Sequence, residues 1–518
     1  MDSFSAESLA GALAIIGVVI VISALLSGWI DRSGLPQVAV FLALGAALGP
    51  FGLHLLNISL DSATLRAVAT LSLALVLFTD AVSLNIAEVR RRGMLAFRLL
   101  GPGTLLTAAL IALAGWSLLG LSPAAAAILG AALASSDPVL LRGLLRRRDI
   151  PADARHALQL ESGLNDVALL PVVIVAMAFL NQGPVPNGAA LAKLGLDLFV
   201  LGPGAGILVG LLGVAALDLI RKRIGVRRDY ESLYSLGIAF TAFAAAEAVH
   251  GSGFLAAFAA GMTIAALDVE LCDCFVEYGS VTAEMLLLFT FVLLGSSLIW
   301  SAFTVINWPT LLFTAFVVLI RTPVYLLSLI GSGLDMRGRL LIAWFGPRGL
   351  SSLLLILLPV FAGLPGSDQL FSICSLVVLV SVVLHGGSPM LLARAARKKA
   401  LKEDLMRGSA DVASASPPAV VPPDPAPAAP CGLTADGATP SCSVTTEPIG
   451  SQSISLEDLR RLWRENEPVV ILDVRTERSL EGADSQAKGA VRLIPDHVAE
   501  RAKEVGLGKE AWLIAYCA

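Results

Sequence analysis

Two stretches of the chain decide the fold: GAALASSDPVLLR at residues 130–142 and LLIAWFGPRGLSS at residues 340–352. Each belongs to an apolar run that is broken near its middle, by Ser135-Ser136-Asp137-Pro138 in the first and by Gly346-Pro347-Arg348-Gly349 in the second. Proline removes a helix donor, and the residue before it avoids the α-helical region. We therefore predict two interrupted helices, a pair that in inverted repeats indicates a binding site near the middle of a membrane.

The composition is that of a membrane protein. Of the 518 residues, 56% are hydrophobic and 15% are charged, and the mean hydropathy is +0.78. A soluble domain is usually about half apolar and one quarter charged. The excess predicts an all-α polytopic membrane protein surrounded by the lipid bilayer, and we expect no nucleic-acid partner. The acidic start, Met1 to Glu7, predicts no cleaved signal peptide.

About thirteen apolar runs of spanning length lie between residues 8 and 396. Only helices satisfy their own backbone in lipid over such a length. We therefore expect about 13 transmembrane helices in inverted repeats, with the two broken helices fifth and twelfth in order. The approximate centres of the runs are Val19, Leu42, Ala74, Ala108, Ala134, Pro171, Gly206, Phe240, Gly261, Leu288, Thr314, Leu350 and Val380.

Basic residues predict the orientation in the membrane. They cluster after the third, fifth, seventh and thirteenth runs, for example at Arg90, Arg146, Arg221 and Lys398, whereas the even-numbered exits carry almost none. Because cytoplasmic loops carry the excess of Lys and Arg, we expect a multi-pass protein of the cell inner membrane. Its N-terminus would lie outside and its C-terminus in the cytoplasm.

The chain divides into three parts by composition. Residues 1–396 form the predicted transmembrane domain, and residues 397–450 form a basic flank and a Pro/Ala-rich linker, which we interpret as extended and cytosolic. Residues 451–518 predict a small α/β unit, with an amphipathic helix over Leu456–Glu465 and buried strands over Val469–Asp473 and Trp512–Cys517.

Charged groups inside the bilayer are costly, so each one is a candidate for function. The candidates are Asp80, Asp137, Glu161, Asp166 and Arg348. Asp166 would lie about 16 Å deep, near the middle of the bilayer, at ~1.5 Å of rise per residue. An intramembrane aspartate can also be a structural hydrogen-bonding group. We prefer a functional role for Asp166, Asp137 and Asp80, and a structural ion pair for Glu161 and Arg348.

The chemistry that these residues predict is exchange. A buried carboxylate can be neutralised by a proton or by a bound cation, and one such group on a moving element couples the two ions. Hard cations prefer oxygen ligands. The metal ligands would come from Asp166, Asp137, the hydroxyl of Ser162 and the backbone near Ser136. Ser162 shares a helix face with Asp166.

Residues from about Leu9 to Ala396 resemble the monovalent cation:proton antiporter family of the sodium/proton exchanger type. The similarity is carried by five motifs in order: Phe78-Thr79-Asp80, Ser135-Ser136-Asp137-Pro138, Glu161-Ser162-Gly163-Leu164-Asn165-Asp166, Gly251-Ser252-Gly253-Phe254-Leu255-Ala256 and Gly346-Pro347-Arg348-Gly349.

The resemblance implies a homodimer whose mobile core bears the two crossed broken helices. It implies that Asp166 carries the ion, that Ser162 is a ligand, and that Glu161 pairs with Arg348. In this family an asparagine before the carrier, here Asn165, goes with electroneutral one-for-one exchange. The transported ions would be Na⁺, or K⁺ or Li⁺, and H⁺, with no cofactor.

Two residues depart from the family pattern. Ser136 stands where threonine is more common, and Asp80 stands where glutamate is common. Both keep oxygen chemistry, so they bear on ion selectivity more than on activity.

The C-terminal unit resembles a rhodanese domain through Ile471-Leu472-Asp473-Val474-Arg475, Lys488-Gly489-Ala490-Val491 and the strand that ends at Cys517. The resemblance makes Cys517 the sulfur carrier, whose thiolate would need a backbone nest in the loop that follows. The sequence stops at Ala518, so we expect an incomplete domain without sulfurtransferase activity; a small buried thiol at a strand end is the alternative interpretation.

Three functions therefore compete. The leading hypothesis is a secondary active antiporter that works by alternating access around Asp166. The second is a membrane-tethered sulfurtransferase that uses Cys517. The third is a cation channel, which would not need a titratable aspartate beside two broken helices.

Overall fold

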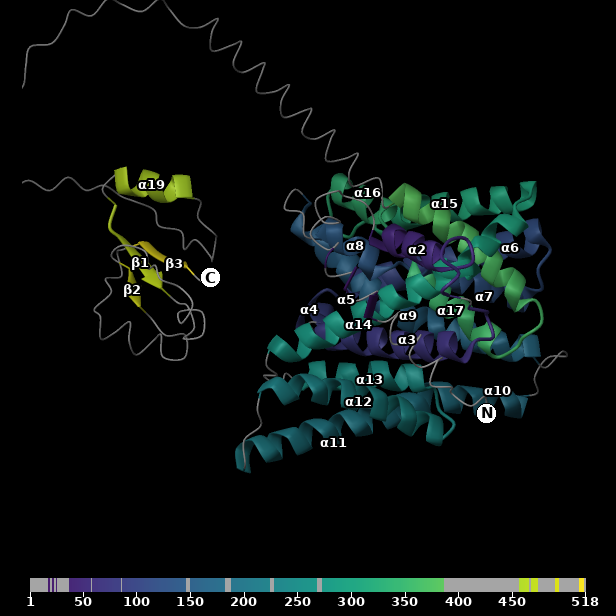
Figure 1. Ribbon diagram of the computed structural model, residues 1–518, viewed down its shortest axis with the longest axis horizontal. Helices are drawn as coiled ribbons and strands as arrows, with labels where there is room; N and C mark the ends of the chain where they lie inside the picture. The colour runs from purple at the N-terminus through teal and green to yellow at the C-terminus, as the bar shows by residue number, and fades with distance from the viewer. Residues whose placement is uncertain are drawn as a thin grey trace, which may run out of the picture. The chain divides into compact units, whose positions relative to one another are not determined.

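The computed structural model describes residues 17–18, 21–22, 25, 37–56, 58–84, 86–145, 150–181, 188–223, 228–267, 273–385, 456–464, 467–473, 490–492 and 512–516. The chain divides into two compact units, Met1–Ser416 and Pro417–Ala518. Each unit is described by itself (Figure 1).

The regular elements in the described part of the first unit are all helices. Its helices are α2 (Gln37–Leu48), α3 (Ala63–Ser83), α4 (Ile86–Arg91), α5 (Gly93–Arg98), η1 (Leu99–Leu105), α6 (Leu106–Leu119), α7 (Pro123–Ala134), α8 (Pro138–Leu145), α9 (Ala152–Asn181), α10 (Gly188–Leu196), η2 (Asp197–Leu201), α11 (Gly202–Arg223), α12 (Arg228–Ala248), α13 (Gly253–Ala266), α14 (Asp273–Leu293), η3 (Leu294–Leu298), η4 (Ile299–Val305), α15 (Trp308–Ser328), α16 (Met336–Trp344) and α17 (Leu350–Phe361), followed by the helix Ser367–His385.

Seven helices within the described residues are long and apolar enough to cross a membrane, and five more apolar helices of 10–17 residues accompany them. This confirms a mostly helical, polytopic membrane protein. The first predicted run, centred on Val19, lies mostly outside the described residues, so the number 13 stays a prediction.

Both predicted interruptions are present. Helix α7 ends at Ala134 and α8 begins at Pro138, while α16 ends at Trp344 and α17 begins at Leu350. The chain between the halves is not helical; Ser135 is extended, with φ −63° and ψ 136°. Proline at the first position of α8 has no N–H to leave unpaired there, so the second half can restart at once.

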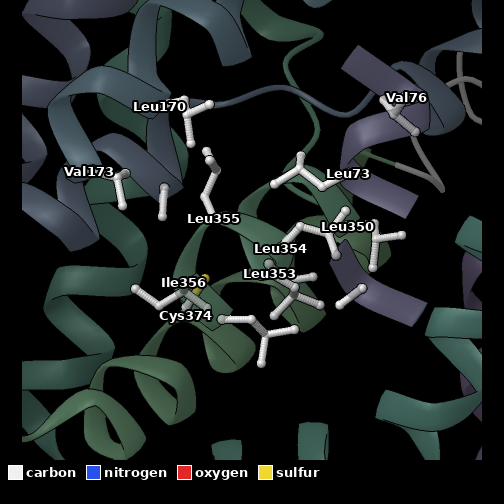
Figure 2. Close-up of a cluster of buried hydrophobic side chains, with 14 of the residues drawn as sticks. Leu73, Val76, Leu170, Val173, Leu350, Leu353, Leu354, Leu355, Ile356 and Cys374 are labelled. Carbon is white, nitrogen blue, oxygen red and sulfur yellow. The ribbon is translucent and has the colours of Figure 1, made fainter. Parts of the chain in front are cut away.

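The half-helix α17 is enclosed by protein rather than by lipid. Every residue from Leu350 to Leu357 is buried, and a helix that is apolar on all sides is typical of such a position. Figure 2 shows side chains of α3, such as Leu73, and of α9, such as Leu170 and Val173, around the leucines of α17. This packing places the second break beside α9.

Helix α13 joins the helices that bear the predicted motifs to the rest of the unit. It packs against α3 and also against α11 and α12, and lies between α3 and α12 in Figure 1. The approach to α3 is close, because a Cβ at Gly261 would touch the carbonyl oxygen of Phe78. Glycine therefore lets α13 lie directly on the segment of α3 that leads to Asp80.

The second unit contains helix α19 (Leu456–Arg464) and a three-stranded parallel sheet in the order β2-β1-β3. The strands are β1 (Val469–Asp473), β2 (Val491–Arg492) and β3 (Trp512–Tyr516), with Ile471 paired to Ile514. The predicted helix and both predicted strands are confirmed at these residues, but the expected burial of the second strand is wrong, since Trp512 and Leu513 are 42% and 51% exposed. The rhodanese resemblance stays a prediction, and Cys517 lies outside the described residues.

Candidate functional site

The two breaks meet each other. The Asp137 N–H donates to the carbonyl oxygen of Pro347 at 2.9 Å, and the Asp137 Oδ2 accepts from the N–H of Leu350, the first residue of α17. A carboxylate at a helix N-terminus satisfies an otherwise unpaired N–H and lies at the positive end of the helix dipole. Asp137, a predicted cation ligand, lies in the first broken helix. Its two hydrogen bonds therefore link that helix to the second broken helix.

This junction needs glycine at residue 349. A Cβ there would overlap the carboxylate of Asp137. We expect Gly349→Ala to lower the free energy of unfolding by about 1–3 kcal/mol, the usual cost of overpacking, and to reduce ion exchange strongly. Thermal unfolding of the purified protein and transport in vesicles measure both.

The matched control is Gly237→Ala in α12, where a Cβ would meet nothing within 4 Å. Alanine is favourable within a helix, so this variant should unfold at the same or a higher temperature than the unchanged protein. Equal behaviour of the two glycine variants would contradict the close junction.

Asp166 lies beside this junction, on α9, with 3% of its surface exposed. Its Oδ1 accepts a hydrogen bond from the hydroxyl of Ser135, in the first break. The hydroxyl of Ser351, in the first turn of α17, faces the same carboxylate. The other oxygen, Oδ2, is buried and has no hydrogen-bond partner. A buried carboxylate oxygen without a hydrogen bond destabilises the folded protein unless a proton or a cation binds to it.

Asn165 connects α9 to the first break. Its Nδ2 donates to the carbonyl oxygen of Ser136 at 3.1 Å and to the hydroxyl oxygen of the same serine at 2.8 Å. The Ser136 hydroxyl in turn donates to Glu161 Oε1 at 2.7 Å. The Oδ1 of Asn165 is buried without a partner. The open acceptors in this part of the described chain are therefore Asp166 Oδ2 and Asn165 Oδ1.

The predicted ion pair named the wrong arginine. Glu161 pairs with Arg321 of α15, whose two terminal nitrogens reach Glu161 Oε1 at 3.0 Å and Oε2 at 2.8 Å. The Tyr325 hydroxyl adds a third bond to Glu161 at 3.1 Å, and the Arg321 guanidinium lies 3.8 Å from the centre of the Tyr325 ring. The pair is fully buried and bidentate, the strongest geometry for arginine and carboxylate.

The hydrogen bonds of Arg348 go to other groups. Its guanidinium donates to the carbonyl oxygen of Gly346 at 2.9 Å, and its backbone N–H donates to Ser381 at 2.7 Å. The physical reason is space: a Cβ at Gly346 would overlap the guanidinium of Arg321. Glycine at this position therefore opens the second break to the arginine of α15.

Two further predicted ligands are Ser162 and Asp80. The Ser162 hydroxyl donates to the carbonyl oxygen of Gln159 at 3.3 Å. Asp80 is half-buried near the end of α3. Among the described residues, no group of three His, Cys, Asp or Glu side chains could hold a metal ion.

The sequence analysis missed Ser135, Ser351, Arg321 and Tyr325. Arg321 carried a signal, since it is a charged residue in the middle of an apolar run. Ser135 and Ser351 carried only a weak one: both lie in or directly after a break.

Comparisons with known proteins cover the helical unit. A family profile described as "Sodium/hydrogen exchanger, transmembrane" matches residues 19–394. The K(+)/H(+) antiporter NhaP2 of Shewanella sp. (strain MR-4) is 27% identical over 401 residues, which are 76% of this chain and 68% of that protein. The K(+)/H(+) antiporter NhaP of Alkalimonas amylolytica is 26% identical over 394 residues, 75% of this chain and 67% of that protein.

A solved structure has the same fold. The sodium proton antiporter MjNhaP1 from Methanocaldococcus jannaschii at pH 8 superimposes with a TM-score of 0.61 at 23% sequence identity, and the match covers 74% of this chain and 98% of that chain.

Proposed function

Because the chain belongs to the sodium/hydrogen exchanger family, and is therefore a transporter rather than an enzyme, we propose that it exchanges a monovalent cation for protons at Asp166. The observation that carries this proposal is the buried, unpartnered Oδ2 of Asp166 at the junction of the two broken helices. Inside a membrane such an oxygen needs a proton or a cation. The two cannot occupy it together, so the release of one accompanies the binding of the other.

Alternating access follows from this competition. The core can change its exposure from one side of the membrane to the other when Asp166 is neutralised, by a proton in one direction and by the cation in the other. A negatively charged, empty carboxylate opposes the change because it would cross the bilayer unpaired. The open Oδ1 of Asn165 supplies a second oxygen for the cation.

One-for-one exchange is supported by the neighbouring carboxylates. Asp137 is engaged with Leu350, and Glu161 is engaged with Arg321. A single carboxylate with an open oxygen takes up one proton or one monovalent cation, so the exchange would be electroneutral.

We propose Na⁺ as the transported cation, with K⁺ or Li⁺ as alternatives. The two bacterial relatives are K⁺/H⁺ antiporters, and the structural neighbour is a sodium proton antiporter. Hydroxyl, amide and carboxylate oxygens accept all three cations.

The test is exchange in vesicles that contain the purified protein and a pH-sensitive dye. Addition of Na⁺, K⁺ or Li⁺ should move protons out of acid-loaded vesicles, and choline should not. An imposed membrane potential should leave the rate unchanged, because no net charge crosses. A rate that follows the potential would contradict one-for-one exchange, and a large cation current would indicate a channel.

We further propose that the protein lies in the cell inner membrane as a homodimer, with the N-terminus outside and the C-terminus in the cytoplasm. Large apolar side chains on α11, including Leu208 and Leu212, are exposed and suit lipid or a second copy. The alternative hypothesis, a sulfurtransferase that uses Cys517, has no support among the described residues.

A further inference from the structure

Two serine hydroxyls, one from each break, converge on Asp166. Ser135 comes from the segment between α7 and α8 and donates to Asp166 Oδ1. Ser351 comes from the first turn of α17 and faces the same carboxylate. The exposed fractions of the two residues are 0% and 5%. Elements that are far apart in the sequence thus bring two buried hydroxyls to one charged group.

The other oxygens of the breaks are turned to other partners. The Ser136 carbonyl accepts from Asn165, the Pro347 carbonyl accepts from the Asp137 N–H, and the Ser135 carbonyl accepts from Ser352 at 3.4 Å. These bonds hold the two breaks and α9 together. The two hydroxyls beside Asp166 can turn about their own bonds, in contrast to these carbonyls.

We propose that Ser135 and Ser351 are ligands of the transported cation. A hydroxyl has one proton to donate and two lone pairs. Without a cation, the Ser135 hydroxyl donates to the charged carboxylate. When the cation binds, both hydroxyls rotate and present lone pairs to it, as hard cations require. This inference rests on the proposed exchange at Asp166.

The ligand role has a measurable consequence. Removal of either hydroxyl takes one oxygen ligand from the cation, so the affinity for the cation should fall. Loss of a serine that only supports the fold would not lower the cation affinity of the folded protein.

The experiment measures exchange by the full-length protein in vesicles, as a function of cation concentration and pH, for Ser135→Ala and Ser351→Ala. We expect the KM for the cation to rise about tenfold in each, the usual effect of losing one bond to a charged group. The maximal rate should change less.

Two further variants separate ligand chemistry from packing. Ser351→Cys keeps a side chain of similar shape, but sulfur is a poor ligand for a hard cation, so its KM should rise as in the alanine variant. Ser372→Ala is the control, because it removes another largely buried serine hydroxyl, whose hydrogen-bond partner at 3.0 Å is Ser301 and not Asp166. This variant should keep the KM of the unchanged protein.

A second readout does not depend on turnover. A bound cation raises the unfolding temperature of the purified protein in proportion to its affinity. The midpoint of this rise should move to higher cation concentration in Ser135→Ala and Ser351→Ala. An unchanged KM and an unchanged midpoint in both variants would overturn the serine ligands and leave exchange at Asp166 standing. Absence of exchange by the unchanged protein would overturn the proposed function itself.

Discussion

Asp166→Asn should abolish exchange, to the level of vesicles that lack the protein, while the variant still folds and inserts. Asparagine has nearly the shape of aspartate, and its Oδ1 can still accept the hydrogen bond that Ser135 donates to Asp166. The asparagine side chain carries no charge and takes up no proton, so neither the proton nor the cation binds at the position of Oδ2. Dye-based exchange with each cation, at matched amounts of protein, measures the loss.

Asp218→Asn is the matched control for this result. Asp218 is an exposed aspartate on α11 that pairs with Lys222 at 2.7 Å, and exposed pairs contribute little to stability. Its variant should exchange at the full rate. Cation-driven proton movement by Asp166→Asn, at any pH where the unchanged protein works, would remove Asp166 from its proposed role as carrier.

The sequence predicted the parts of the site that violate the rules of a membrane helix. A proline beside Asp137, a glycine-proline pair beside Arg348 and a carboxylate at Asp166 are conspicuous in apolar runs, because each is costly in lipid. Both interruptions, and the burial of Asp166, follow directly from these violations. The same rule applied to Arg321, which lies in an equally apolar run, but the prediction left it out.

The pairing of charges across the fold could not be read in the same way. Glu161 and Arg321 are 160 residues apart. Helical periodicity gives the face on which a residue lies but not the helix that the face meets. The prediction of Arg348, which lies in a conspicuous motif, therefore missed an arginine whose access to Glu161 depends on the absence of a side chain at Gly346.

The direction of a side chain in a break is equally hidden. Ser135 and Ser136 are neighbours, yet one donates to Asp166 and the other to Glu161. In a helix, the regular angle between successive residues would have predicted the direction of each side chain. In the extended backbone at Ser135, the direction depends on local dihedral angles that no residue pattern specifies.

Arg321→Met should strongly destabilise the helical unit, lowering the free energy of unfolding by about 3–5 kcal/mol. The variant leaves Glu161 charged, buried and without its bidentate partner, and an uncompensated buried charge has a cost of this order. Thermal unfolding of the purified protein in detergent, with the unchanged protein alongside, gives the loss.

The double variant Glu161→Gln with Arg321→Met should recover at least half of that loss, because no charge is then left unpaired. Glutamine can still accept the bonds from Ser136 and Tyr325, so the remaining network survives. The same cycle with Arg348→Met in place of Arg321→Met should give a smaller coupling energy, since the guanidinium of Arg348 binds the Gly346 carbonyl. A larger coupling of Glu161 to Arg348 than to Arg321 would reverse the assignment of the pair.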